Sequence, residues 1–178
     1  WGGSESGTVA YPCWATFPYP SVDQVRFTDI NDRNFALLKH GDPAGGYWMP
    51  AMSDAPLRGY YGRHEWFWEP GDDAHVYPLQ DLVEMYYKSV GRNSTLILGL
   101  TPDTSGLLPE ADVQRLKEFG DEVRRRFGSP VATTEGAGEL LRLDLPATQP
   151  VNHFVIQERI AQGELIRRYR VEAMVDGT

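Results

Sequence analysis

Two stretches of the chain repeat apolar residues at the spacing of an amphipathic helix. The first begins after Pro78 and places its apolar side chains on one face: Leu79, Leu82, Val83, Tyr86, Tyr87 and Val90. The second fits residues 110–127, with Pro109 near the first turn and an apolar side made of Val113, Leu116, Phe119, Val123 and Phe127. Gly91 and Gly128 follow these runs, so we expect each helix to end there.

A short apolar run lies between these two helices and a different pattern follows them. Residues 95–100 (TLILGL) are typical of a strand covered on both faces, and a helix followed by a buried strand indicates an α/β segment. After Pro130 three strand-like runs, 140–145, 151–156 and 166–171, are separated by Pro or Gly turns. We therefore expect a boundary near residues 128–138, followed by an all-β segment too short for a complete sandwich of about seven strands.

The first 70 residues are rich in Gly, Pro and aromatic residues, which is typical of long loops that carry function. All five tryptophans occur there, Trp1, Trp14, Trp48, Trp66 and Trp68, interleaved with Glu5, Asp29, Asp54, Arg58, His64 and Glu65. Sugar rings stack on aromatic side chains, and hydrolysis of a glycosidic bond uses two carboxyl groups. The same composition also fits tryptophans in a core and acids on a surface, so it leaves both interpretations open.

Charge and motif spacing exclude several other classes of protein. The chain has 17 basic and 25 acidic residues, a formal charge of −8 and no block of like charge, so we do not expect a nucleic acid partner. It has no run of 18 apolar residues, so we expect no membrane span. The four histidines form no metal-binding motif and the glycines form no phosphate loop, and we expect neither a metal nor an organic cofactor.

Three further features have structural explanations. Cys13 is the single cysteine and cannot form an internal disulfide, so we expect it to be buried and inert. The cations at residues 124–126 close a predicted helix, where they oppose the negative end of its dipole, so we interpret them as a solvated helix end and not an anion site. Asn93-Ser94-Thr95 matches the N-glycosylation pattern, but it borders a buried strand, so we expect Asn93 to form structural hydrogen bonds.

Several strings, in chain order, resemble the α-L-fucosidases of glycoside hydrolase family 29. Residues 1–7 (WGGSESG) look like the W-x-G-N-E-x-G loop of the family, and residues 47–54 and 65–68 look like its W-x-P-x-E-x-D and WFW stretches. Residues 89–107 are similar to its SVGRN-x-LLLN-x-PPD-x-xGL block, and residues 156–166 resemble its QE-x-I-x-x-GE-x-I motif. The resemblance covers essentially the whole chain.

The resemblance implies a two-part fold. Residues 1–129 would form the C-terminal part of a (β/α)8-like (TIM) barrel, and residues 130–178 would begin a β-sandwich domain. The absence of an initial Met and the finish just after a strand-like run suggest that both ends lie within a longer protein. The N-terminal part of that enzyme is then the expected partner, the oligomeric state is open, and the resemblance suggests a periplasmic or secreted location.

The resemblance also implies a retaining exo-α-L-fucosidase that acts on fucosylated glycans or oligosaccharides. Glu5 matches the general acid/base of one subgroup, with Glu65 as its main rival, and the aspartate nucleophile would precede Trp1. We expect the fragment alone to be inactive for this reason. The alternative is a catalytically silent protein that binds fucose or another carbohydrate.

The remaining site residues are predicted with smaller roles. We expect the following to contact the substrate: Trp48, Trp66, His64, Asp54 and Glu65. Phe67 and Trp68 are expected to pack, because alternate residues of an extended segment face opposite sides. Ser4 stands where the family pattern has Asn and Met52 where it most often has Glu, so the linkage preference is open.

Overall fold

A parallel sheet forms the centre of the molecule. The structure is a computed structural model that describes residues 2–18, 35–62, 66–160 and 164–174. Its main sheet has the order β1-β4-β5, with these strands: β1 Gly2–Ser4, β4 Ala51–Pro56 and β5 Ser94–Gly99. All pairings are parallel, and the register places Ser4 beside Ser53 and Ser53 beside Leu96. This sheet confirms the α/β class, and a strand is present within one residue of the predicted range. The expectation that this strand is covered on both faces is wrong, because Ser94 is the only one of its residues that is buried.

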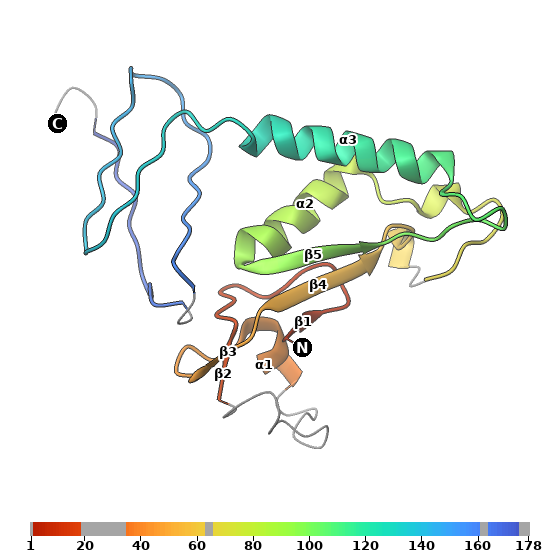
Figure 1. Ribbon diagram of the computed structural model, residues 1–178, viewed down its shortest axis with the longest axis horizontal. Helices are drawn as coiled ribbons and strands as arrows, with labels where there is room; N and C mark the ends of the chain where they lie inside the picture. The colour runs from red at the N-terminus through yellow and green to blue at the C-terminus, as the bar shows by residue number, and fades with distance from the viewer. Residues whose placement is uncertain (1, 19–34, 63–65, 161–163, 175–178) are drawn as a thin grey trace.

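Both predicted helices are present, and they pack together beside β5 (Figure 1). Helix α2 spans Leu79–Ser89 and helix α3 spans Glu110–Phe127. Buried Leu57 and Leu82 form the centre of their contact with the sheet, together with these partly buried side chains: Tyr77, Leu98, Ala111, Leu116 and Phe119. Leu98 faces the helices. Because successive side chains of a strand point to opposite faces, Ile97 lies on the other face of β5, where its side chain is 42% exposed.

Short elements connect these parts, and the sequence pattern predicted none of them. Strands β2 (Thr16–Phe17) and β3 (Tyr47–Trp48) form an antiparallel pair, and helix α1 (Phe35–His40) contacts β1. The described part of the chain also contains these 3₁₀ turns: η3 Tyr60–Gly62, η4 Asp73–His75 and η5 Val90–Arg92. Such short elements carry too few residues for a periodic apolar pattern to emerge.

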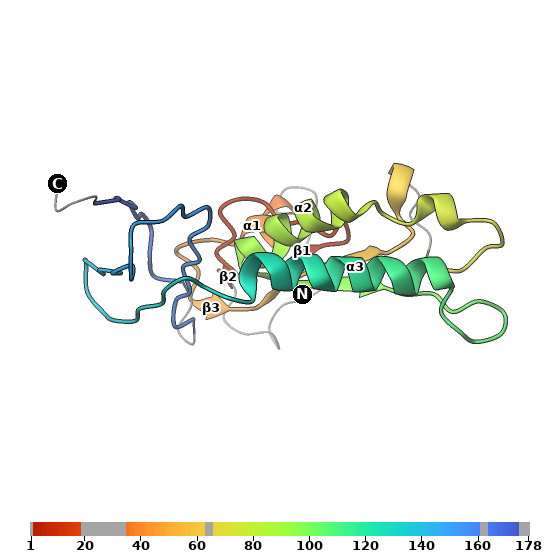
Figure 2. The same cartoon turned by 90° about the horizontal axis from the view of Figure 1, so that it is seen from above.

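The chain after α3 differs from the sequence-based expectation. Among the described residues beyond Phe127, none belongs to a helix or a strand, so the three predicted strands are absent. Many apolar side chains of this segment are exposed, among them Leu140 at 88% and Met174 at 71%. A strand is stable only when neighbouring strands satisfy its backbone groups and cover its apolar face, and this segment contains no such layer. Figures 1 and 2 show the segment after α3 as long loops that extend beyond the end of this helix.

Candidate active site

Glu5 occupies the turn that immediately follows β1. Ser4, the last residue of the strand, is buried beside Ser53 of β4, whereas Glu5 is exposed. In parallel α/β sheets, ligands bind beyond the carboxyl ends of the strands. Glu5 therefore lies at the end of the sheet where catalytic side chains are usually found.

The side chain of Ser4 stabilises this turn. Its Oγ accepts a hydrogen bond from the backbone N–H of Ser6 at 3.2 Å and lies 2.6 Å from Ser6 Oγ. A serine hydroxyl and an asparagine amide oxygen both accept bonds from a backbone N–H two residues further on. Ser4 can therefore keep the turn in shape although the motif it resembles has Asn at this position.

Gly7 closes the turn where only glycine fits. Its N–H donates to the carbonyl oxygen of Asp54 at 2.9 Å, and its φ is +68°. A Cβ atom at this position would lie 2.4 Å from Sδ of Met85, which is part of α2. The turn that carries Glu5 is thus fixed between β4 and α2.

The segment that follows the turn is held by hydrogen bonds to residues 88–93. The N–H of Val9 donates to the carbonyl of Lys88 at 2.9 Å, and Arg92 Nη1 donates to the carbonyl of Val9 at 2.8 Å. Asn93 Nδ2 makes a longer bond of 3.5 Å to the carbonyl of Cys13. Cys13 is only 5% exposed and Asn93 bonds to the backbone, as the sequence predicted for both residues.

Asp54 lies next to the turn and carries an unused acceptor. Its backbone carbonyl accepts the Gly7 bond, while its side-chain Oδ1 is buried and accepts no hydrogen bond from the described residues. A buried carboxylate oxygen without a hydrogen-bond partner is uncommon in proteins, because most buried polar atoms are hydrogen-bonded. A sugar hydroxyl is one donor that this oxygen could accept from.

Trp66 lies against the last residue of β5. A Cβ atom on Gly99 would stand 2.5 Å from Cζ3 of the indole, so the ring passes directly over this glycine. Gly99, like Pro56 beside it, ends its strand. Glu5 directly follows β1, Trp66 lies against the last residue of β5, and Asp54 lies in the second half of β4, the strand between them. We call this side of the molecule the carboxyl end of the sheet.

Trp48, another predicted site residue, is not brought to this place. Trp48 belongs to β3 and pairs with Thr16, before β4 begins, which puts it at the amino end of β4 and away from Asp54. Its Nε1 is buried and has no hydrogen-bond acceptor among the described residues. His64 and Glu65 lie outside the residues that the structure describes.

Arg58 supports the segment that carries Trp66, a role that the sequence did not indicate. Its side chain is 2% exposed and binds Asp112 through two nitrogens, at 2.6 and 3.3 Å. The same guanidinium contacts Asp73 at 3.0 Å. This network joins the end of β4 to the first turn of α3 and to η4. No spacing rule could have revealed it, because the partners are 15 and 54 residues apart.

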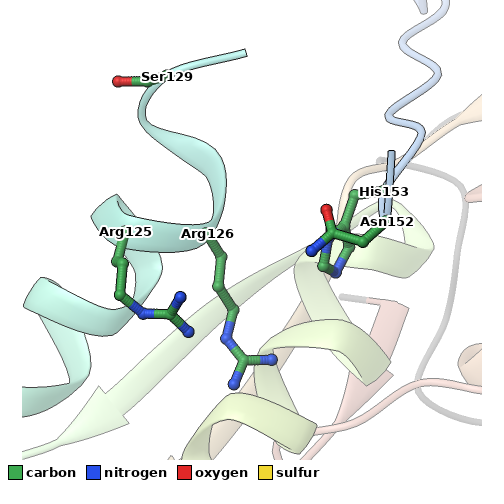
Figure 3. A pocket seen from close by; sticks show the side chains of 5 residues that line it. All are labelled: Arg125, Arg126, Ser129, Asn152 and His153. Carbon is green, nitrogen blue, oxygen red and sulfur yellow. The ribbon is translucent and has the colours of Figure 1, made fainter. Parts of the chain in front are cut away.

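A polar pocket at the end of α3 lies elsewhere (Figure 3). It is lined by Arg125, Arg126, Ser129, Asn152 and His153, none of which was predicted as a site residue. Both arginines pair with Glu122, at 2.7 and 2.6 Å. The paired cations agree with the solvated helix end that the sequence indicated. Within the described residues, no group of three or more His, Cys, Asp or Glu side chains could hold a metal ion, and no helix is long and apolar enough to cross a bilayer.

Comparison with curated proteins identifies two plant relatives, while no protein-family model matches the chain. A candidate α-L-fucosidase 1 of Oryza sativa subsp. japonica is 30% identical over 99% of the chain and 38% of that protein. The α-L-fucosidase 1 of Arabidopsis thaliana is 31% identical over 74% of the chain and 24% of that protein. The chain thus spans well under half the length of the curated relatives it matches.

Solved structures show the same similarity in three dimensions. A candidate α-L-fucosidase from Bacteroides thetaiotaomicron VPI-5482 has a TM-score of 0.65 and 61% identity, and the match covers 74% of the chain and 30% of that protein. A glycoside hydrolase 29 family member from an unknown rumen bacterium has a TM-score of 0.60 and 27% identity, over 78% and 23%. Sequence and fold therefore point to one group of proteins.

Proposed function

The chain belongs to the α-L-fucosidases of glycoside hydrolase family 29, and we propose on this basis that the protein containing it is a retaining exo-α-L-fucosidase. The proposed substrates are glycans or oligosaccharides that end in α-L-fucose. The observation that supports this proposal is the position of Glu5, exposed in a turn at the carboxyl end of the sheet that a backbone hydrogen bond joins to Asp54.

Glu5 is proposed as the general acid/base. In a retaining mechanism this carboxyl group first protonates the oxygen of the leaving group while a carboxylate nucleophile attacks the sugar carbon. The ionised group then removes a proton from the water that hydrolyses the glycosyl-enzyme intermediate. Both steps need a carboxyl group that keeps one position, and the bonds of Ser4 and Gly7 restrict the turn in this way.

The nucleophile is proposed to be an aspartate in another part of the protein. We assign this role to no aspartate of the chain, since the motif that carries the nucleophile in the family has no counterpart here. Residues 1–178 alone are therefore proposed to be inactive and to require the remainder of the enzyme. In that enzyme, residues 1–129 would complete a (β/α)8-like barrel and residues 130–178 would begin a β-sandwich.

Asp54 and Trp66 are the proposed contacts to the fucose ring. The free Oδ1 of Asp54 would accept a sugar hydroxyl, and the indole of Trp66 would cover an apolar face of the ring. Trp48, His64 and Glu65 remain predictions. For Trp48 to contribute, the substrate would have to extend toward the amino end of β4.

The test is hydrolysis of an aryl α-L-fucoside by the full-length protein, beside Glu5→Ala and the control Glu139→Ala. Glu139 is also an exposed glutamate but lies beyond α3. We expect Glu5→Ala to lose most of its activity and azide to restore turnover by forming a fucosyl azide, since azide needs no general base. Retention is checked by NMR of the anomer released first.

The outcomes separate the alternatives. Full activity of Glu5→Ala would move the assignment to Glu65. A wild-type protein that binds fucose but hydrolyses no fucoside would support the silent carbohydrate-binding protein instead.

A further inference from the structure

Two aromatic side chains at the carboxyl end of the sheet are almost fully in solvent. Tyr61 is 78% exposed and Phe67 is 80% exposed, and both belong to the segment between β4 and α2. The sequence predicted that Phe67 would pack, and the structure shows that this prediction is wrong. Trp66 takes the packed position instead, so its neighbour faces water. Large exposed aromatics near a site often bind a ligand.

Tyr61 adopts a backbone conformation that an aromatic residue normally avoids. Its φ and ψ are 60° and 27°, in the left-handed region. Glycine would adopt this conformation without steric cost, whereas a tyrosine there costs about 1–3 kcal/mol. Because the ring remains mostly in solvent, burial of its apolar surface offsets little of this cost.

Neighbouring rings hold Tyr61 in one orientation. Its ring lies 4.1 Å from that of Tyr60, and it meets the ring of His75 edge to face at 6.4 Å. Tyr60 in turn packs on Tyr77 at 5.9 Å. These contacts fix the ring before any ligand arrives, so binding costs little additional side-chain entropy.

The ends of the segment are fixed as well. Arg58, near the start of the segment, forms an ion pair with Asp73, near its end, and with Asp112 of α3. These ion pairs hold the two ends of the segment together. Trp66 packs against Gly99, which fixes the backbone position of the neighbouring residue Phe67. Tyr61 and Phe67 therefore project from a supported segment at the same end of the sheet as Glu5.

We propose that Tyr61 and Phe67 form a subsite that stacks on the sugar residue to which fucose is attached. The ligand class is a pyranose ring, whose apolar C–H face packs on an aromatic ring. This inference rests on the proposed function, because it places the fucose itself beside Glu5. It assigns recognition of the remainder of the oligosaccharide to a different segment from the one that carries Glu5.

The experiment compares two binding reactions of the full-length protein: a fucosylated lactose trisaccharide and free fucose, both measured by calorimetry. The variants are Tyr61→Phe, Tyr61→Gly and Phe67→Ala, with Tyr11→Ala as the control. Tyr11 is 69% exposed and stacks with Arg92, at the amino end of β5. The glycine variant removes the ring and also relieves the backbone strain, and thermal unfolding of each variant checks that the fold is kept.

We expect Tyr61→Gly and Phe67→Ala to weaken trisaccharide binding about 3- to 10-fold each, and to leave fucose binding unchanged. Tyr61→Phe and Tyr11→Ala should behave like the wild type. The proposal is overturned if Tyr61→Gly and Phe67→Ala bind the trisaccharide normally, or if they weaken both ligands equally. The experiment measures binding and needs no turnover. A protein that hydrolyses no fucoside would therefore refute the proposed fucosidase activity, while the binding data would still test the proposed subsite.

Discussion

The N–H of Gly7 donates to the carbonyl of Asp54 across 2.9 Å, so the turn after β1 and the strand β4 are joined at the level of Glu5. A side chain on Gly7 would disturb this turn, because the φ of Gly7 is +68° and the added Cβ would lie 2.4 Å from Sδ of Met85. We predict that Gly7→Ala displaces the turn, destabilises the full-length protein by about 1–3 kcal/mol and lowers kcat more than tenfold.

Urea unfolding and fucoside kinetics check this prediction. Gly46→Ala is the control, since no atom lies within 4 Å of the added Cβ and its φ is not positive. Equal kcat values for the two variants would contradict the fixed turn.

Arg58 and Asp112 form a buried ion pair, with side-chain exposures of 2% and 0%. Arg58→Met leaves Asp112 as a buried charge without its partner, and we predict a loss of about 3–5 kcal/mol in the free energy of unfolding. Asp73→Ala removes only the exposed partner, which is 71% exposed, and should cost less than about 1 kcal/mol. Denaturant unfolding of both variants measures the difference, and similar losses would show that burial does not govern this network.

Gly99 provides the surface on which Trp66 rests. In Gly99→Ala the new Cβ would lie 2.5 Å from the indole, so the ring must move. If Trp66 covers the fucose, the inhibition constant of free fucose should rise several-fold. Gly91→Ala is the control, because its nearest neighbour would be 3.9 Å away. An unchanged inhibition constant in Gly99→Ala would remove Trp66 from the site.

Glu164 makes the stability of the chain depend on pH. Burial and the nearby charge of Glu158 raise its pKa from 4.5 to about 7, although Arg167 and a hydrogen bond from Asn93 oppose the change. The folded state therefore holds this proton more tightly than the unfolded state, and stability must fall as the pH rises from 4.5 to about 7.

The variant Glu164→Gln removes this titration. We predict that Tm falls less between pH 5 and pH 8 in Glu164→Gln than in the wild type, by roughly 2–4 °C. Glu139→Gln, which changes an exposed glutamate, should keep the wild-type dependence. Parallel Tm profiles for all three proteins would contradict the coupling.

Burial raises the pKa of the Cys13 thiol from 9.0 to about 11, against a hydrogen bond from the backbone of Ala15 that lowers it. The thiolate is the reactive form, and at pH 8 its fraction falls about 100-fold for such a change. We predict that iodoacetamide modifies Cys13 at least 100-fold more slowly than a free cysteine, as measured by peptide mass spectrometry. Urea should abolish this protection, and rapid labelling of the folded protein would contradict it.

Periodic apolar patterns predicted the helices well, because their side chains repeat over several turns. Both α2 and α3 match the expected ranges, and α3 ends at its C-cap Gly128 as predicted. Helix α2 ends at Ser89, and Gly91 lies within the 3₁₀ turn η5 that follows, so the predicted stop at this glycine is wrong. Strand β4 was not predicted, since Ala51–Pro56 mixes small, polar and apolar residues that are buried only by neighbours distant in sequence. The three strands expected after residue 138 are absent, because an alternating pattern specifies a face and does not supply the layer that covers it.

The candidate site was predicted in part. The motif around Glu5 indicated a loop, and the structure shows a turn there with Ser4 and Gly7 in supporting positions. Sequence could not show that Trp66 contacts Gly99 or that Trp48 lies at the other end of β4. Both facts depend on the register and direction of strands, and these are set by contacts between distant segments.

The left-handed residue Asn93, with φ of 60°, has a practical consequence for producing the protein. Its side-chain amide bonds to Cys13 and Glu164, yet it is also the acceptor of an Asn-Ser-Thr sequon. In the secretory pathway of a eukaryotic host, oligosaccharyltransferase can modify such a sequon before β5 has paired. A glycan there would block the Asn93 contacts, so a bacterial host is the safer choice for expression.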